Sequence, residues 1–442
     1  MSPPTPYGAQ MDDTPRLDLG AFPDVFGYER AAALDRADPL AGERAHFVVD
    51  DPDIVYLDGN SLGRLPTAAI DRIDDAVRRQ WGDRLIRSWQ EGWWELPEDL
   101  GRLLAPVVGA EPDEVLVSDS TSVNLFKLAA AALIAAPDRH RVLTDDLNFP
   151  TDLYILRSAA RAAGSGQVVE VIGSDGIEGP IDAIEAAIDD DTALVSLSHV
   201  TFKSGYRYDL ARLTAKAHEV GALVLWDLSH SVGAVPVELG ATNADLAVGC
   251  MYKYLNGGPG APAFLYVRRD LHNRLENPIE GWWAHGDPFA FDLDFTPVAG
   301  IRRFHTGTMP ILSLAGAEAG IAQVARVGID AVRTKSVALG RYLAEQWRHH
   351  LEPVGFGWAS PTDAQRRGSH VSLSHPDAWR IAQAYKEHAL VIPDFRTPDN
   401  LRLGFAPLYN SFVDLHTAVI RLRAVVERGL HLDYPEDRKG VS

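Results

Sequence analysis

Cysteine, lysine and long apolar runs are scarce in this chain of 442 residues, and each shortage excludes a class of protein. The one cysteine, Cys250, rules out an intrachain disulfide and any metal site built from several thiolates. No apolar run approaches the roughly 18 residues that span a bilayer, so we expect no membrane partner. The opening MSPPTPYGAQMDD has neither the basic nor the apolar region of a signal peptide, and we therefore expect a soluble cytoplasmic protein.

Positive charge is also in short supply. The chain has 61 acidic and 42 basic residues, which gives a formal net charge of −19. Such a chain repels polyanions at long range, so nucleic acid is not an expected partner. A bound phosphate would need backbone amides and a few well-placed side chains. The histidines at positions 199, 230, 285 and 305 share no metal-ligand spacing, so we expect no metal site.

The pattern of apolar segments indicates an α/β protein of two domains. Short apolar strands alternate with helical segments from about residue 115 to residue 226, as in parallel β-α-β units. The C-terminal region instead reads as strand, helix, strand and helix, which is an α+β pattern. The expected strands of the first region are Val115–Val117, Val142–Leu143, Val168–Ile172, Ala193–Leu197 and Leu223–Trp226.

Lys253 differs from the other six lysines in its surroundings. It lies in the segment Ala244–Leu255, where it ends an apolar strand, and the glycine-rich Gly257–Gly260 follows. This context places an amine where water is limited and where a ligand can approach the backbone. Burial disfavours the charged amine and lowers its pKa, which suits a Schiff-base nucleophile. The segment alone fits equally well a lysine that extends from a strand end to the surface.

Asp227 strengthens the catalytic interpretation of Lys253. It ends the apolar strand Leu223–Trp226, one β-unit before Lys253. A pyridoxal ring withdraws electrons effectively when its pyridine nitrogen stays protonated, and a buried aspartate ensures this. The alternative role for Asp227 is a helix N-cap, and both roles can hold together. Ser118–Ser122 lies between a strand and a helix and could hold a phosphate, although a plain helix cap is the commoner use of such residues.

Other candidates stay ambiguous when each is considered alone. Phe149–Asp152 fits a simple turn into a helix, and Arg402 fits an exposed arginine as well as a clamp for a carboxylate. Tyr252 could be a packing residue. Cys250 reads as a small buried hydrophobic residue.

Taken together, the motifs resemble the kynureninase family. The matches occur in the expected order between about residues 54 and 415, which is far more specific than any single motif. The resemblance implies a fold similar to that of the aspartate aminotransferases, which is pyridoxal-phosphate fold type I. The matching segments are Tyr56–Gly63, Phe149–Asp152, Trp226–Ala234, Tyr252–Gly260, Gly281–His285, Phe304–Thr308 and Pro407–Phe412.

The resemblance also implies the domain organisation. A large three-layer α/β/α cofactor domain with a mainly parallel sheet is expected over residues 66–310. A smaller α+β domain is expected over residues 311–442, together with part of residues 1–65, of which about the first 27 form a loose arm. The implied assembly is a homodimer with its active sites at the interface.

A role for each matching residue follows from the resemblance. Lys253 would carry pyridoxal 5′-phosphate and move protons, Asp227 would pair with the pyridinium, and Phe149 would stack on the ring. Arg402 would hold the α-carboxylate of the substrate, and Tyr252 would pass a proton. Further cofactor contacts are implied for Thr121, Ser122, Pro150, Thr151, Asp152, Ser198, His230, Tyr252, Trp282 and Thr308, of which Trp282 and Thr308 would come from the partner subunit. Asn60, Ser61 and Gly307 would line the substrate pocket.

The implied reaction is the hydrolysis of L-kynurenine to anthranilate and L-alanine by Cβ–Cγ cleavage, a step of tryptophan degradation and of NAD biosynthesis. The pair Gly307-Thr308 resembles the bacterial type, which prefers kynurenine, whereas the animal type resembles Ser-Asn there. One alternative is another lyase of this fold, either cysteine desulfurase-like or epimerase-like. A second is a pyridoxal-phosphate-binding regulator without catalysis. The first lacks a mobile cysteine, and the retention of Lys253, Asp227 and Arg402 argues against the second.

Overall fold

The computed structural model describes residues 27–436, and the N-terminal arm expected up to about residue 27 lies outside this range except for its last residue. A seven-stranded sheet runs through the centre, in the order β2-β8-β7-β6-β5-β3-β4. The strands are β2 (Val115–Val117), β3 (Arg141–Asp145), β4 (Val168–Ile172), β5 (Thr192–Ser198), β6 (Leu223–Asp227), β7 (Leu246–Cys250) and β8 (Ala263–Val267).

Strand direction confirms the mainly parallel sheet expected from the sequence. Strands β3 to β7 pair in parallel with their neighbours, while β8 is antiparallel to both β7 and β2. Every residue of β5, β7 and β8 is buried, as expected for strands covered on both faces. Strand β8 was not predicted, because periodicity alone does not distinguish a short apolar run from a buried helical segment.

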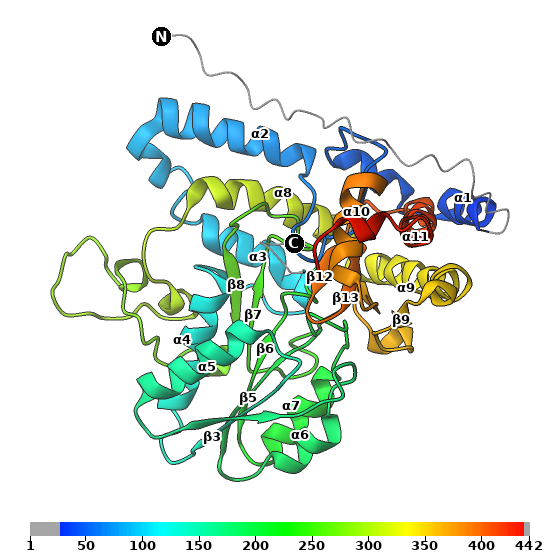
Figure 1. Cartoon of the computed structure of the whole chain (residues 1–442). Coiled ribbons are helices and arrows are strands. Elements are labelled where there is room, and N and C mark those ends of the chain that lie inside the picture. The colour runs from blue at the N-terminus through cyan, green and yellow to red at the C-terminus, as the bar shows by residue number, and fades with distance from the viewer. Residues whose placement is uncertain (1–26, 437–442) are drawn as a thin grey trace.

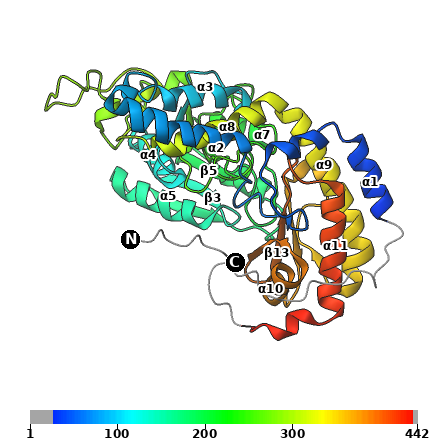
Figure 2. The ribbon, with the colours of Figure 1, turned by 90° about the horizontal axis from the view of Figure 1, so that it is seen from above.

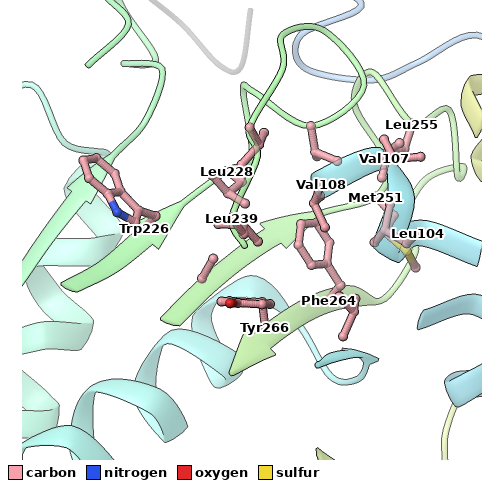
Figure 3. Packing of buried hydrophobic residues seen from close by; sticks show 14 of the residues in the cluster. Leu104, Val107, Val108, Trp226, Leu228, Leu239, Met251, Leu255, Phe264 and Tyr266 are labelled. Carbon is pink, nitrogen blue, oxygen red and sulfur yellow. The ribbon is translucent and has the colours of Figure 1, made fainter. Parts of the chain in front are cut away.

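Helices cover both faces of this sheet (Figure 1). Successive strand residues point to opposite faces, so Leu225 packs under α4 and α5 while Trp226 packs on the other side. Figure 3 shows part of this second side, where Val108 of α3 lies near Phe264 of β8. The covering helices are α4 (Thr121–Ile134) and α5 (Pro150–Ala163) on one face, and α3 (Leu96–Val108), α6 (Ile181–Ala187), α7 (Leu210–Glu219) and α8 (Ile311–Val327) on the other.

A second core lies beside the first and draws on both ends of the chain (Figure 2). A four-stranded antiparallel sheet, β12-β13-β10-β9, packs with helices in this core. Its elements are α1 (Tyr28–Ala37), α9 (Ile329–Gln346), β9 (Gly357–Trp358), β10 (His370–Ser374), α10 (Ala378–Ala389), β12 (Asp394–Arg396), β13 (Asn400–Gly404) and α11 (Phe412–Glu427). The short strand β1 (Val55–Tyr56) joins it by pairing in parallel with β11 (Val391–Ile392).

The two cores meet between α8 and α9. Leu314 and Ile321 of α8 pack in the larger core, whereas Leu339 and Tyr342 of α9 pack in the smaller one. Helix α8 also lies along α2 (Thr67–Asp75) at the top of Figure 1. The expected domain boundaries at residues 66 and 311 stay a prediction. Among the described residues, no helix combines the length and apolarity needed to cross a membrane.

Candidate active site

A cavity of about 240 Å³ lies at the carboxyl ends of the parallel strands, the edge at which open α/β sheets bind ligands. All of its lining residues except Ser229 and Arg396 were predicted as site residues. The lining consists of Asn60, Ser61, Thr121, Ser122, Phe149, Thr151, Asp152, Asp227, Ser229, His230, Tyr252, Lys253, Arg396 and Arg402.

The direction of the strands explains why distant residues meet here. Asp227 is the last residue of β6, and Lys253 comes three residues after β7, its parallel neighbour. Strand β2 runs in the same direction as β7, because both are antiparallel to β8. Thr121 and Ser122, which begin α4 after β2, therefore lie at the same edge of the sheet.

The amine of Lys253 faces a neutral histidine. Its Nζ lies 3.3 Å from Nε2 of His230 and 5.9 Å from the ring centre of Tyr252. Burial, followed by the charges of Lys253 and Arg402, holds the pKa of His230 well below its usual value. The imidazole can therefore accept a hydrogen bond from the amine. Within residues 27–436, no carboxylate forms an ion pair with Lys253.

Two carboxyl groups share the floor of the cavity. Oδ1 of Asp227 accepts a hydrogen bond from the Ser229 N–H at 2.8 Å, so Asp227 caps a tight turn rather than a helix. Asp152 is buried, and its Oδ2 has no hydrogen-bond partner among the described residues. Burial and then the charge of Asp227 raise the pKa of Asp152 well above its ordinary value, against the opposing effect of Lys253. Burial therefore favours the neutral form of Asp152 more than it does for an exposed carboxyl group.

Hydroxyl groups and backbone amides form another wall. Oγ of Ser120 accepts from the Val123 N–H at 3.4 Å and caps α4. The N–H groups of Thr121 and Ser122 belong to the first helical turn, where no intrahelical acceptor exists. Beneath them, the buried Lys127 donates to Oδ2 of Asp119 at 2.8 Å and to the Phe304 carbonyl at 2.6 Å. This wall suits an anion.

Arg402, on β13, is 1% exposed and reaches the cavity from the smaller core. It donates to Oγ of Ser61 at 2.9 Å and to the Phe202 carbonyl, and it forms an ion pair with Asp394. With its amide oxygen turned inward, Asn60 accepts from Nε of Arg402 at 2.8 Å.

Arg396 also pairs with Asp394, at 2.8 Å, so one carboxylate bridges two arginines of the cavity. The sequence analysis missed both Asp394 and Arg396. The turn between β12 and β13 was the available signal, because a hairpin there places Asp394 opposite Arg402.

The remaining predicted residues do not line the cavity of this single chain. Ser198 lies beneath it, next to Asp227 in the sheet, and donates to Oδ1 of Asn148 at 2.5 Å. Pro150 is the first residue of α5, where its missing N–H costs nothing. Trp282 is 42% exposed, and its ring centre lies 5.5 Å from that of Trp94. Gly307 is partly exposed and Thr308 is exposed.

Comparison with known proteins points to one family. The kynureninase C-terminal domain family matches residues 332–422. The kynureninase of Pseudomonas fluorescens is 42% identical over 401 residues, which cover 90% of this chain and 94% of that protein. The kynureninase of Burkholderia mallei strain SAVP1 is also 42% identical, over 404 residues that cover 90% of this chain and 95% of that protein.

Solved structures agree on the fold at much lower identity. A cysteine desulfurase from Thermococcus onnurineus NA1 has a TM-score of 0.74 and 20% identity, covering 90% of this chain and 99% of that one. The Escherichia coli cysteine desulfurase CsdA has a TM-score of 0.74 and 18% identity, covering 89% and 98%. These similarities concern the fold alone, and they confirm the α/β class expected from the sequence.

Proposed function

The chain belongs to the kynureninase family, and we propose that it hydrolyses L-kynurenine to anthranilate and L-alanine with pyridoxal 5′-phosphate bound in the cavity around Lys253. The observation that carries this proposal is the meeting of Lys253, Asp227 and Arg402 around one small cavity. These are an amine, a carboxylate and a guanidinium, which come from three separate parts of the chain. The reaction belongs to tryptophan degradation through kynurenine, which we place in the cytoplasm.

Pyridoxal 5′-phosphate fits the groups that the cavity leaves available. The Lys253 amine has no ion pair within the described residues, Oδ2 of Asp152 is buried without a partner, and the first turn of α4 offers free N–H groups. Lys253 would hold the cofactor covalently, Asp227 would face its ring nitrogen, and Thr121 with Ser122 would hold its phosphate. Phe149, 39% exposed at the cavity, is available to cover the ring. Bound there, the cofactor supplies an electron sink for negative charge at the substrate α-carbon.

Lys253 is the group that moves the α-proton in this proposal. The Lys253 amine lines the cavity, where it can accept the α-proton of a bound substrate. His230, kept neutral by burial, can orient the amine through the 3.3 Å contact between Nζ and Nε2. His230 is therefore a positioning residue for Lys253.

Arg402 is the proposed clamp for the α-carboxylate. Its planar guanidinium can bind a carboxylate by two parallel hydrogen bonds, which fixes the orientation of the α-carbon. The bonds to Ser61 and to the Phe202 carbonyl hold it in place before substrate binds. Because Asp394 already neutralises Arg402, the substrate carboxylate must share the guanidinium with it.

Tyr252 is the proposed proton donor during cleavage of the Cβ–Cγ bond. The nearby Cys250 and then burial raise its pKa, so the phenol keeps its proton at neutral pH. A protonated phenol beside Lys253 can give a proton to the departing group and later recover it.

Two subunits are proposed to complete each site. Trp282 and Thr308 lie away from the cavity of their own chain and are exposed. Large apolar side chains are also exposed along the segment after α2, where Trp81 is 57% and Ile86 is 75% exposed. Mixing inactive Lys253→Ala chains with a second inactive variant at Trp282 should restore activity if the sites are shared. Failure of mixed dimers to regain activity would contradict sharing at Trp282.

The cysteine desulfurase alternative finds little support at the cavity. That chemistry needs a cysteine on a mobile segment, and Cys250 is 1% exposed within β7. Burial also raises the pKa of its thiol, which disfavours the thiolate nucleophile. A regulator that binds the cofactor without turnover would need no carboxylate clamp.

The deciding experiment is incubation of the purified protein with L-kynurenine while anthranilate fluorescence is followed. We expect anthranilate and L-alanine in equal amounts, and no sulfur release from L-cysteine. Borohydride reduction followed by peptide mapping should locate the cofactor on Lys253. Cofactor binding without anthranilate would favour the regulator, and sulfur release would favour the desulfurase.

A further inference from the structure

A second and larger depression lies on the face of the sheet covered by α6 and α7. It is a cleft of about 830 Å³, and none of its lining residues lines the active-site cavity. Helices α6 and α7, the segment after β5 and the segment 365–366 from the smaller core form its walls. The residues important for its chemistry are His199, Arg207, Asp209, Arg212, Glu238 and Arg366.

Three arginines at and behind this cleft form no ion pair within residues 27–436. Arg207 lines the cleft and, within residues 27–436, forms no ion pair and no side-chain hydrogen bond. Arg333 and Arg367 lie behind it, 8% and 2% exposed, and their guanidinium groups donate only to backbone carbonyls of the described residues. Burial lowers the pKa of each to about 10. Such a concentration of unpaired cations is unexpected in a chain with a net charge of −19.

The charges of Asp209, Asp363 and Glu238 act on Arg207, but none of these carboxylates forms an ion pair with it within residues 27–436. Asp182 is paired with Arg212, and Asp209 accepts from the Arg212 N–H as the cap of α7. Arg366 is paired with Glu178. Glu238 is exposed to solvent at the rim, where water screens its charge. Arg207 therefore remains the cation that an incoming anion can reach.

His199 supplies a second unsatisfied group in the same cleft. It is 3% exposed, and its Nδ1 has no hydrogen-bond partner in the part of the chain that the structure describes. Burial, then the charges of Arg207 and Arg333, lower its pKa to about 3, so the ring is neutral and keeps one N–H donor. In the tautomer with that hydrogen on Nδ1, the ring has a donor without an acceptor within the described residues, and a ligand oxygen can accept it.

We propose that this cleft is a second ligand site, in which Arg207 and His199 bind a small oxyanion, either a carboxylate or a phosphate. A guanidinium donates two parallel hydrogen bonds to either group, and the cleft is large enough for a small metabolite that carries one. The site is separate from the proposed catalytic reaction and does not depend on it.

Thermal unfolding of the cofactor-saturated protein tests the proposal, because the added cofactor fills the phosphate wall of the active site. Inorganic phosphate and benzoate are the two probes, and sodium chloride at equal ionic strength is the reference. At about a hundred times Kd we expect one probe to raise Tm by about 3 °C over the reference. Phosphate would indicate a phosphorylated ligand, and benzoate a carboxylate.

Arg207→Gln is the diagnostic variant. It should abolish the rise in Tm, yet unfold at the same or a higher temperature without added anion, because an unpaired charge has been removed. Arg269→Gln, an exposed arginine paired with Asp113, and Arg402→Gln in the active site should both keep the rise. No rise in the unaltered protein, or an equal rise in Arg207→Gln, would overturn the proposal.

Discussion

The two sides of the active-site cavity differ in how far the protein satisfies their polar groups. On the sheet side, Lys253 has only a neutral histidine beside its amine, and Asp152 has a buried oxygen without a partner. On the side of the smaller core, Arg402 is bound by Asp394, Ser61 and a backbone carbonyl. The first side therefore offers polar groups that a ligand can bind, whereas the guanidinium of the second is already held by protein partners.

This difference fits the two ligands that we propose. A cofactor that stays bound can be part of the finished structure, so the groups that hold it need no substitute partners. A substrate binds and dissociates in every turnover, so the guanidinium that binds it is held in position by protein groups when no substrate is bound. The comparison leads to five predictions, from the largest effect to the smallest.

Removal of the Lys253 amine should have the largest effect. Lys253→Ala should lower kcat by at least about 10,000-fold, because no other described amine lines the cavity to move the α-proton. Anthranilate release measures the loss. The control is Lys216→Ala, since Lys216 lies on α7 and is paired with Glu219. Normal turnover by Lys253→Ala would refute the view that the sheet side carries the chemistry.

Asp227 separates a charge effect from a structural one. Asp227→Asn keeps an oxygen that can accept from the Ser229 N–H but removes the negative charge. We expect kcat to fall about 100- to 10,000-fold for both Asp227→Asn and Asp227→Ala, with Asp227→Glu milder. Exchange of the substrate α-proton, followed by NMR in deuterium oxide, should slow in parallel. If Asp227→Asn were fully active, Asp227 would act only as the cap of a turn.

The substrate side should respond mainly in KM. Arg402→Lys loses the two-pronged geometry, so we expect KM for L-kynurenine to rise about 100-fold, with a smaller change in kcat. Arg396→Gln is the matched control, because it removes the other arginine bound to Asp394. Its KM should change less than tenfold. Equal effects of the two substitutions would show that the arginine pair acts as one clamp.

The free energy of unfolding should depend on pH through Asp58, which lies near Asp394. Burial and then the charge of Asp394 raise the pKa of Asp58 to about 6. Between about pH 4 and pH 6 the folded protein keeps a proton that the unfolded chain has lost. The free energy of unfolding therefore falls by about 2 kcal/mol as pH rises through this window.

Asp58→Asn should remove this slope. Urea unfolding at pH 4.5 and pH 6.5 measures it, and the exposed substitution Asp83→Asn should leave it unchanged. The same slope in Asp58→Asn would assign the pH dependence to other groups.

The smallest effect concerns the aryl end of the substrate. A site without a partner for an extra ring hydroxyl pays about 1–3 kcal/mol to bury it. We expect kcat/KM to be about tenfold higher for L-kynurenine than for 3-hydroxykynurenine, which corresponds to about 1.4 kcal/mol. The double change Gly307→Ser with Thr308→Asn should narrow this ratio, and no atom lies within 4 Å of a Cβ at Gly307. A preference of the unaltered protein for the hydroxylated substrate would contradict this reading of the pair.

The local pattern of the chain was enough to predict most of the secondary structure. The strand expected at Val168–Ile172 has those bounds, and the helix expected at Ile181–Ile188 ends one residue earlier. Strands β8 and β12 were missed for different reasons. Strand β8 is a short apolar run, which periodicity alone does not assign to a strand. Strand β12 has only three residues, and the first and last of them are charged.

Some residues of the candidate site could likewise be predicted from the local sequence, and others could not. Lys253 and Asp227 could be identified because Asp227 ends an apolar strand and Lys253 closely follows another, and residues at these ends of parallel strands meet at one edge. Asp394 and Arg396 carry no such local signal. Their place at the cavity depends on the pairing of β12 with β13.

By itself, the sequence determined the α/β class, the family and the edge of the sheet at which the site lies, because these depend on periodicity and on motifs of neighbouring residues. Only the tertiary structure decided which charges are neutralised. Ser61 and Arg402 come together where Asp58 bridges to Gly404 at the end of β13, and Arg207 forms no ion pair within residues 27–436. Ion pairing and burial depend on distances between segments far apart in the chain, and a local pattern contains no such distances.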